Sequence, residues 1–306
     1  MKGDERMAVP NAPGKRITYT KIFPYLLIAP VLIYVLIFLV FPFFYGIGIS
    51  LTDKKIGSSV NFIGLKNYVQ LLKEQKFVTS IKNTMTYTVI SVLLKVILGM
   101  AMALVLNAKI RGRSLARGLL LIPWAVPTTV SIYVWKWMFA DTGGVLNAML
   151  MGTGVVDQKI AWLSTPAMAM SAIVLVNVWR GAPFIGISVL SGLQTISSDL
   201  YESATVDGAG AFARFCYITI PSIKNVLMLS TLVTTIWTFN DFEIIWLLTK
   251  GGPLNSTQVI STYSYQAGIL QMDFGKAVAA SIMFLPVIIV IVNIITGYTL
   301  KKGDDY

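Results

Sequence analysis

Residues 199–221 read DLYESATVDGAGAFARFCYITIP, a run of charged and small residues between two long apolar segments. One of three residues can cap a short helix at its start: Ser197, Ser198 or Asp199. Glu202 is then expected in the first turn of that helix, where the helix dipole favours an anion. The start of this stretch therefore predicts a short polar helix.

A bend and a second helix should follow. Gly208 and Gly210 permit a sharp turn. Helical residues then continue until Pro221, which is expected to start the next apolar segment. The whole region 195–222 is thus predicted to be a helix–turn–helix outside the membrane. Its small apolar face would suit the groove of a partner protein, or would simply cover the ends of the neighbouring spans.

The flanking composition predicts a membrane protein. The chain has 306 residues, of which 55% are hydrophobic and 13% charged, whereas a soluble protein carries about 25% charged residues. Six stretches are long and apolar enough to cross about 30 Å of hydrocarbon. They lie near residues 22–50, 83–107, 116–140, 167–192, 223–248 and 277–300. We expect an all-α integral membrane fold with six transmembrane helices over residues 22–300.

The arginine distribution predicts the orientation. Loop arginines are confined to the N-terminal tail, the 108–118 loop and Arg214. These segments share one side of the membrane if the spans alternate, which makes the tails 1–21 and 301–306 cytoplasmic. Six lysines in the 51–82 loop oppose this assignment. The net charge of +11 is interpreted as membrane anchoring rather than nucleic-acid binding.

Several chemistries are excluded or disfavoured by composition. The chain has no histidine and a single cysteine, Cys216, so a zinc site, a histidine-based triad and an intrachain disulfide are not expected. No G-x-x-x-x-G-K-[ST] sequence occurs, so the chain is not expected to bind ATP by that route. Scattered carboxylates without a paired nucleophile and base argue against a membrane enzyme.

Polar faces on the fourth and fifth spans mark a candidate translocation path. Thr231, Thr234, Thr238 and Asp241 are spaced by three, four and three residues, which places them on one helix face. A carboxylate at membrane depth costs roughly 3 kcal/mol unless it is paired or hydrated. Threonines alone often serve only helix–helix hydrogen bonding. The carboxylate favours a water-filled path.

The fourth span supplies a matching face. Asn177 and Arg180 are three residues apart, and Arg180 is a possible partner of Asp241 in one state. Aromatic rings complement the apolar faces of sugars, although tryptophans in spans more often lie at the interface or in the core. The predicted path residues are Asn177, Trp179, Arg180, Gly181, Thr234, Trp237, Thr238 and Asp241.

Other charges in the spans leave alternatives open. Lys95, near the middle of the second span, could snorkel, pair with Asp241 or face a cavity. Lys136 and Glu243 are expected to snorkel or be paired. An ion-coupled secondary transporter that relays charge through Asp241, Arg180 and Lys95 is the alternative function. It would leave the 199–221 region unexplained.

The 199–221 region resembles the EAA loop of binding-protein-dependent ABC importer permeases. Glu202-Ser203-Ala204, Asp207-Gly208-Ala209 and Ile218-Thr219-Ile220-Pro221 match the pattern of that loop. The resemblance implies a cytoplasmic coupling helix that docks into an ATPase subunit, with Glu202 as its charge contact. The residues implied in coupling are Tyr201, Glu202, Ser203, Ala204, Asp207, Gly208, Ala209, Ile218 and Pro221.

Further segments resemble the carbohydrate branch of these permeases. They are Phe62–Tyr68, Leu121–Pro127 with Trp135–Phe139, and Leu248–Pro253 followed by Ser256-Thr257 and Asp273–Gly275. The resemblance implies a type I importer in a prokaryotic cell membrane that carries a di- or oligosaccharide or a related sugar. Its partners would be a second, different permease chain, two ATPase subunits that bind ATP and magnesium, and an extracytoplasmic binding protein. In such pairs this chain could be the permease that does not touch the sugar.

Overall fold

The computed structural model describes residues 16–108 and 111–300, and most of them are helical. The termini 1–15 and 301–306, which contain most of the two predicted cytoplasmic tails, lie outside the described residues. Between residues 16 and 300 the described chain forms no strand beyond two isolated bridges. It divides into two compact units, Met1–Ile49 and Ser50–Tyr306.

The described part of the first unit is one apolar helix, which ends at Ser50, the first residue of the second unit. It consists of α1 (Arg16–Val35), a π-helical turn η1 (Leu36–Val40) and α2 (Phe41–Ser50). Its apolar part, Phe23–Ser50, has a mean hydropathy of 2.8. These 28 residues extend about 42 Å at 1.5 Å per residue, which exceeds the hydrocarbon thickness. The predicted first span is therefore a helix long enough to cross a membrane.

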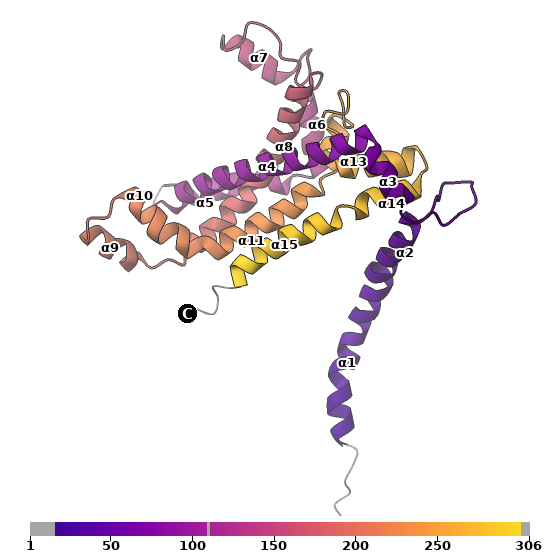
Figure 1. Ribbon diagram of the computed structural model, residues 1–306. Helices are drawn as coiled ribbons and strands as arrows, with labels where there is room; N and C mark the ends of the chain where they lie inside the picture. The colour runs from indigo at the N-terminus through magenta and orange to yellow at the C-terminus, as the bar shows by residue number, and fades with distance from the viewer. Residues whose placement is uncertain (1–15, 109–110, 301–306) are drawn as a thin grey trace, which may run out of the picture. The chain divides into compact units, whose positions relative to one another are not determined.

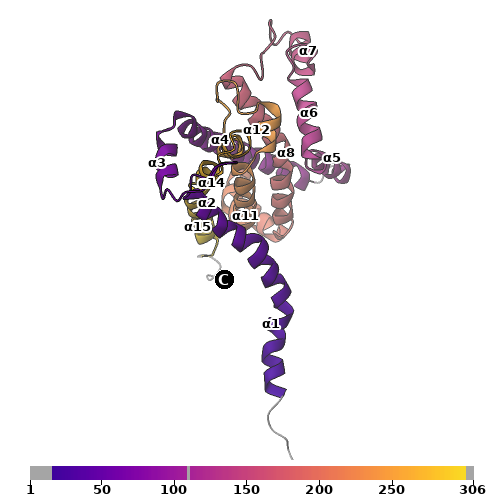
Figure 2. The ribbon, with the colours of Figure 1, turned by 90° about the vertical axis from the view of Figure 1, so that its right-hand side faces the viewer.

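The second unit is a helix bundle built around α4 (Gln75–Asn107) and α8 (Pro166–Leu193). These two helices pack along each other, and α11 (Ile220–Phe239) packs on both. Two further helices complete the bundle: α5 (Arg113–Ala125) on α8 and α15 (Leu285–Leu300) on α11. Figures 1 and 2 show α4, α8 and α11 running side by side. The bundle encloses the polar faces of the fourth and fifth spans.

A glycine allows α4 and α8 to approach closely. A Cβ at Gly99 would lie 2.8 Å from the Ile185 Cβ and 3.0 Å from the Gly186 amide nitrogen. Neither neighbour is the end of a flexible side chain. Gly99→Ala is therefore expected to lower stability by roughly 1–3 kcal/mol, the cost of overpacking. Gly118→Ala, where nothing lies within 4 Å of the added carbon, is the control; equal thermal unfolding of the two detergent-purified variants would contradict the prediction.

Two sets of connecting elements lie at opposite ends of the bundle (Figure 1). At one end are α9 (Ser198–Val206) and α10 (Ala211–Arg214), near the end of α4 and the start of α5. At the other end are α3 (Lys66–Lys73), α13 (Ile260–Tyr265) and α14 (Phe274–Ile282). Loops therefore alternate between ends, as a bundle of successive spans requires.

The elements at the second end are tied to one another. Glu74 forms an ion pair with Lys276, and the Tyr263 hydroxyl donates to Glu74 Oε2 at 3.0 Å. Burial and the Glu74 carboxylate raise the pKa of Tyr263. Lys55 and Asp273 form a second ion pair at 3.5 Å. These contacts join the loop after the first helix to α13 and α14.

Two predicted spans are broken. The third, expected as one helix over 116–140, is divided into α5 and α6 (Thr128–Met138), which meet at 91°. Pro127 lacks the amide hydrogen that would continue the helix, and Val126 before it is extended. The fifth, expected to reach residue 248, ends at Phe239, and α12 (Glu243–Leu248) follows. Among the described residues, five helices could span a membrane, or six if the bent pair is one span.

The last predicted span, 277–300, begins earlier and is interrupted. It starts with α14 at Phe274 and continues as α15 after Met283 and Phe284. The α7 helix (Val145–Gly152) forms part of the connection between the third and fourth spans. These differences move element boundaries but leave the predicted all-α membrane fold intact.

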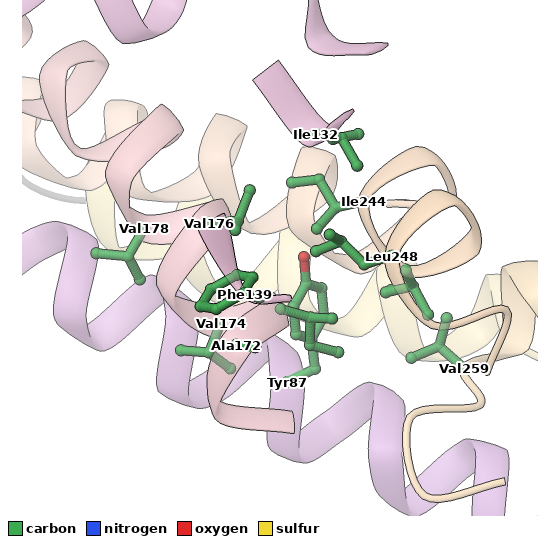
Figure 3. Packing of buried hydrophobic residues seen from close by; sticks show 12 residues of the cluster. Tyr87, Ile132, Phe139, Ala172, Val174, Val176, Val178, Ile244, Leu248 and Val259 are labelled. Atoms are coloured by element: carbon green, nitrogen blue, oxygen red, sulfur yellow. The ribbon is translucent and has the colours of Figure 1, made fainter. Parts of the chain in front are cut away.

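A core cluster at the junction of α4, α6, α8 and α12 surrounds Tyr87 (Figure 3). Ile132, Val176 and Ile244 pack here, and Tyr87 is 1% exposed. The Tyr87 hydroxyl oxygen points toward Ile244. The cluster therefore fixes a polar group of α4 close to the start of α12.

Candidate functional site

A cavity of about 110 Å³ lies between α4, α5, α8 and α11. Water needs roughly 10–15 Å³ of such space per molecule, so the cavity can hold several waters or a polar group of a ligand. Its lining residues are Lys95, Trp124, Asn177, Arg180, Gly181, Phe184, Thr234, Trp237, Thr238, Asp241 and Ile244. The structure thus brings together every predicted path residue except Trp179.

Asp241 is held by hydrogen bonds at the break between α11 and α12. Its Oδ2 accepts from the Tyr87 hydroxyl at 2.6 Å and from Asn177 Nδ2 at 2.9 Å. Its Oδ1 accepts from the Ile244 amide at 3.3 Å, one of the amides at the start of α12 that have no partner within the helix. The broken helix therefore supplies part of the solvation that a carboxylate at this depth requires.

Lys95 faces the cavity, one of the three alternatives that the sequence leaves open. The residue is 3% exposed, and its Nζ donates to Thr238 Oγ1 at 2.8 Å. The Thr238 hydroxyl donates in turn to the Thr234 carbonyl at 2.6 Å. A Cβ at Gly181 would lie 2.5 Å from Lys95 Cε and 2.9 Å from Nζ. The lysine can cross this point only because residue 181 has no side chain.

Arg180 does not pair with Asp241 in this conformation. The ion pairs seen between described residues, Lys55–Asp273 and Glu74–Lys276, include neither Arg180, Lys95 nor Asp241. The Arg180 Nε and the Asn177 Oδ1 are buried and lack a hydrogen-bond partner in the described part of the chain. Two residues that line the cavity from α8 thus keep one donor and one acceptor without a partner, and Lys95 has further donors.

Aromatic rings form part of the cavity wall. Phe184 and Trp237 lie with ring centroids 5.0 Å apart, and Trp124 comes from α5. Trp179, predicted as a sugar platform, instead packs edge-on against Trp135 at 5.5 Å. Trp179 projects to another side of α8, so it belongs to the packing and not to the cavity.

Tyr87 is the polar residue of this site that the sequence analysis missed. Its signal lies in the second span, where Thr84, Thr88, Ser91 and Lys95 follow at spacings of four, three and four. This is the same helical stripe that marked the fifth span, and Tyr87 lies beside it. Examining the second span for that period, and not only for Lys95, would have found this face.

The other two charges in the spans have simple surroundings. The Lys136 ammonium donates to the Leu247 carbonyl at 3.0 Å, so it is paired, one of its two predicted outcomes. Glu243 is exposed in the first turn of α12. Neither residue lines the cavity.

The predicted helix–turn–helix forms at the end of the bundle where α9 and α10 lie (Figure 1). Ser197 caps α9, because its Oγ accepts from the Asp199 amide at 3.3 Å. Since α9 begins at Ser198, Asp199 occupies the first turn and Glu202 lies one turn further on, which corrects the predicted place of Glu202. We call residues 197–221 the hairpin.

Two contacts across the bend hold the hairpin closed. The hydroxyls of Tyr201 and Thr219 lie 2.9 Å apart, and Arg214 Nη1 donates to Thr205 Oγ1 at 2.8 Å. Ala209 packs into the bend, where its amide donates to the Ala204 carbonyl at 2.8 Å. The geometry of the bend is therefore fixed from inside the hairpin.

The outer surface of the hairpin is largely apolar. Val206 is 88% exposed and Phe212 80%, and Leu200 and Tyr217 are also exposed. The side chains of Glu202, Ser203 and Asp207 are exposed as well. A surface of large apolar residues with carboxylates beside them is typical of a protein-binding site.

The second arm of the hairpin is not a separate helix. Residues Ala211–Phe239 form one helix through a π-helical stretch, η2 (Phe215–Thr219), and Pro221 lies inside it. Pro221 lies in the first turn of α11, where the next span was predicted to start, but no break separates α11 from the stretch before it. Ile218 and Pro221 belong to the same rod as the cavity residues Thr234 and Thr238.

The bend depends on one of the two predicted glycines. Gly208 has φ +78°, whereas Gly210 has an ordinary φ of −67°. Gly208→Ala is expected to strain the bend by about 1 kcal/mol, while Gly210→Ala should be neutral because nothing lies within 4 Å of either added carbon. Limited proteolysis of the hairpin in detergent-purified variants measures the difference. Equal cleavage rates would contradict the assignment of the bend to Gly208.

Comparison with known proteins relates the cavity and the hairpin to one kind of protein. Residues 95–300 match the family of binding-protein-dependent transport system inner membrane components. The trehalose/maltose transport system permease protein MalF of Thermococcus litoralis is 40% identical over 260 residues, which cover 85% of this chain and 87% of that protein. The inner membrane ABC transporter permease protein YcjO of Escherichia coli is 32% identical and covers 88% of this chain and 92% of its own length.

A solved structure shares the fold. A chain of a bacterial ABC transporter that imports the acidic polysaccharide alginate superposes with a TM-score of 0.80 and 26% sequence identity. The match covers 94% of this chain and 98% of that one. The bent third span and the helical hairpin thus occur within a fold that aligns over nearly the whole of both chains.

Proposed function

Because the chain belongs to the inner membrane components of binding-protein-dependent transport systems, we propose that it is the permease subunit of an ATP-driven importer for a carbohydrate. The chain is a multi-pass membrane protein with the type I ABC importer permease fold. The cavity between α8 and α11 is the observation that carries the carbohydrate assignment.

The chemistry of the cavity suits a sugar. Sugars present hydroxyls at the ring edge and C–H groups on the ring faces, so their sites combine polar side chains with aromatic ones. Asn177, Arg180 and Lys95 offer unused hydrogen-bonding groups, and Trp237 and Phe184 offer aromatic surface. The named cargoes of the relatives, trehalose, maltose and alginate, are all saccharides. These cargoes support a saccharide as the class of substrate, although trehalose and maltose are neutral and alginate is acidic.

The hairpin is proposed as the contact with the ATPase. Glu202 and the exposed Val206 and Phe212 would dock into an ATPase subunit. ATP and magnesium would bind there, and this chain would be non-catalytic. The hairpin would then lie in the cytoplasm with both termini, as the arginine distribution predicts. Its coupling residues would be Tyr201–Ala204, Asp207–Ala209, Ile218 and Pro221.

The opposite end of the bundle is proposed to receive the cargo. A substrate-binding protein outside the membrane would dock on α3, α7 and the α13–α14 region. One solved relative is an alginate transporter in complex with its sugar-loaded periplasmic protein. A second permease chain would complete the transmembrane path, and two ATPase subunits would drive it.

Uptake in the cell tests this proposal and its alternative. Deleting the gene should abolish high-affinity uptake of at least one labelled saccharide, neutral or acidic, and the ATP-driven uptake that complementation restores should persist when an ionophore collapses the ion gradients. Ionophore-sensitive uptake by this chain alone would favour an ion-coupled carrier that uses Asp241, Arg180 and Lys95. Unchanged uptake of neutral and acidic saccharides after deletion would overturn the carbohydrate assignment.

A further inference from the structure

We propose that Lys95 and Arg180 form a subsite for an acidic group, so that the cargo is a saccharide that carries a carboxylate or a phosphate ester. This inference rests on the proposed carbohydrate function. Both residues line the cavity from different helices, Lys95 from α4 and Arg180 from α8. A sugar bound there would contact both cations.

The first argument is the charge balance of the cavity. Two cations and one carboxylate, Asp241, line it, which leaves a net charge of +1. An uncompensated charge at membrane depth is unfavourable, and buried cations are normally paired. A ligand with one negative charge would neutralise the cavity, whereas a neutral sugar would not.

The second argument is that Asp241 is already occupied. Its oxygens accept from Tyr87, from Asn177 and from the Ile244 amide, all of which are uncharged donors. Within residues 16–108 and 111–300, neither Lys95 nor Arg180 forms an ion pair with it. The carboxylate is solvated by neutral groups, and the two cations remain available for a ligand.

The third argument is the unused hydrogen-bonding capacity of the two cations. Lys95 Nζ has three hydrogens and donates to Thr238 Oγ1. The buried Arg180 Nε has no partner among the described residues. Charge-assisted hydrogen bonds to an anionic oxygen are about twice as strong as neutral ones. Because these donors are charged and unpaired, they favour a carboxylate or phosphate of the ligand over a hydroxyl.

Gly181 explains how the ammonium reaches this place. A Cβ on residue 181 would overlap Lys95 Cε and crowd Nζ. The absence of a side chain at residue 181 leaves space beside α8, and the end of the Lys95 side chain passes through this space to Thr238. Gly181→Ala should displace the ammonium without removing a charge.

Tryptophan fluorescence of the full-length chain in nanodiscs tests the subsite. Trp124 and Trp237 line the cavity, so bound ligand should change their emission. The probes are glucose, glucuronate and glucose 6-phosphate at constant ionic strength, with acetate and inorganic phosphate as sugar-free anions. We expect at least one acidic sugar to bind about tenfold more tightly than glucose. The comparison of glucuronate with glucose 6-phosphate identifies the acidic group.

The variants separate the subsite from the sugar site. Lys95→Met should remove the preference, so that the acidic sugars bind no more tightly than glucose binds to the same variant. Lys95→Arg keeps the charge and should retain part of the preference, and Gly181→Ala should weaken it. Lys82→Met, on the same helix but exposed, is the matched control. It should bind all probes as the unmodified chain does.

The outcomes are distinguishable. Equal binding of glucose and both acidic sugars by the unmodified chain overturns the anion subsite and leaves the carbohydrate function standing. So does a preference that survives in both Lys95→Met and Gly181→Ala. Binding of acetate or phosphate without any sugar contradicts the carbohydrate function while leaving an anion site, and binding of no probe at all contradicts both.

Discussion

Replacing Glu202 with lysine is expected to reduce transport by the assembled importer roughly a hundredfold while the permease still folds and inserts. The side chain is exposed on α9, and in the described part of the chain it has no hydrogen bond or ion pair to lose. Reversing its charge where the hairpin meets a partner would place like charges together, at a cost of several kcal/mol. A hundredfold effect corresponds to about 2.8 kcal/mol.

Two measurements test this expectation. Uptake by proteoliposomes should fall, and the ATPase subunits should co-purify less with a tagged Glu202→Lys chain. Asp157→Lys reverses an exposed charge in the connection between α7 and α8 and serves as the control. It should leave ATPase co-purification unchanged. Unchanged uptake in Glu202→Lys would remove Glu202 from the coupling contact, and an equal loss of ATPase co-purification in both variants would attribute the effect to net charge.

Replacing Asp241 with leucine is expected to destabilise the permease by roughly 2–4 kcal/mol and to abolish uptake. The change leaves the Tyr87 hydroxyl, the Asn177 amide and the Ile244 amide without their acceptor, and an unsatisfied buried polar group costs about 1–3 kcal/mol. Water in the cavity offsets part of this cost. Asp241→Asn keeps one acceptor oxygen and should lose about 1 kcal/mol.

A double-mutant cycle separates the hydrogen bond from general packing. Tyr87→Phe alone should cost about 1 kcal/mol, because one acceptor position of Asp241 becomes empty. In the Asp241→Leu background the same change removes a group that has already lost its partner, so it should cost nothing or stabilise. The coupling energy is then about 1–2 kcal/mol. If Tyr87→Phe costs the same in both backgrounds, the Tyr87–Asp241 bond does not organise the site.

The helices and their order follow from the sequence, but the breaks within them do not. The third span contains both Pro123 and Pro127, and only Pro127 ends a helix. Pro123, Pro183 and Pro221 lie inside helices, because neighbouring helices and a π-helical turn accommodate them. Which proline bends the chain is decided by tertiary packing, and a single sequence carries no signal for it.

The cavity residues were predicted well where their spacing along a single helix determines which face they lie on. At about 100° per residue, Asn177, Arg180 and Gly181 share one face of α8, and Trp179 lies about 200° from Asn177. The same wheel would have removed Trp179 from the predicted path. Residues from other helices, such as Tyr87 and Trp124, reach the site through the packing of α4 and α5 against α8. Helical periodicity within one span can mark a polar face, such as the one beside Tyr87, but it does not show which other helices that face meets.

The rod from Ala211 to Phe239 has a mechanical consequence. Its 29 residues extend about 43 Å at 1.5 Å per residue, with the hairpin at one end and Thr234, Thr238 and the Asp241 break at the other. A tilt of about 10° around its midpoint would displace each end by roughly 4 Å in opposite directions. The helix therefore acts as a lever, because a displacement of the hairpin at one end also moves the cavity wall at the other. It ends at Phe239, two residues before the carboxylate of Asp241.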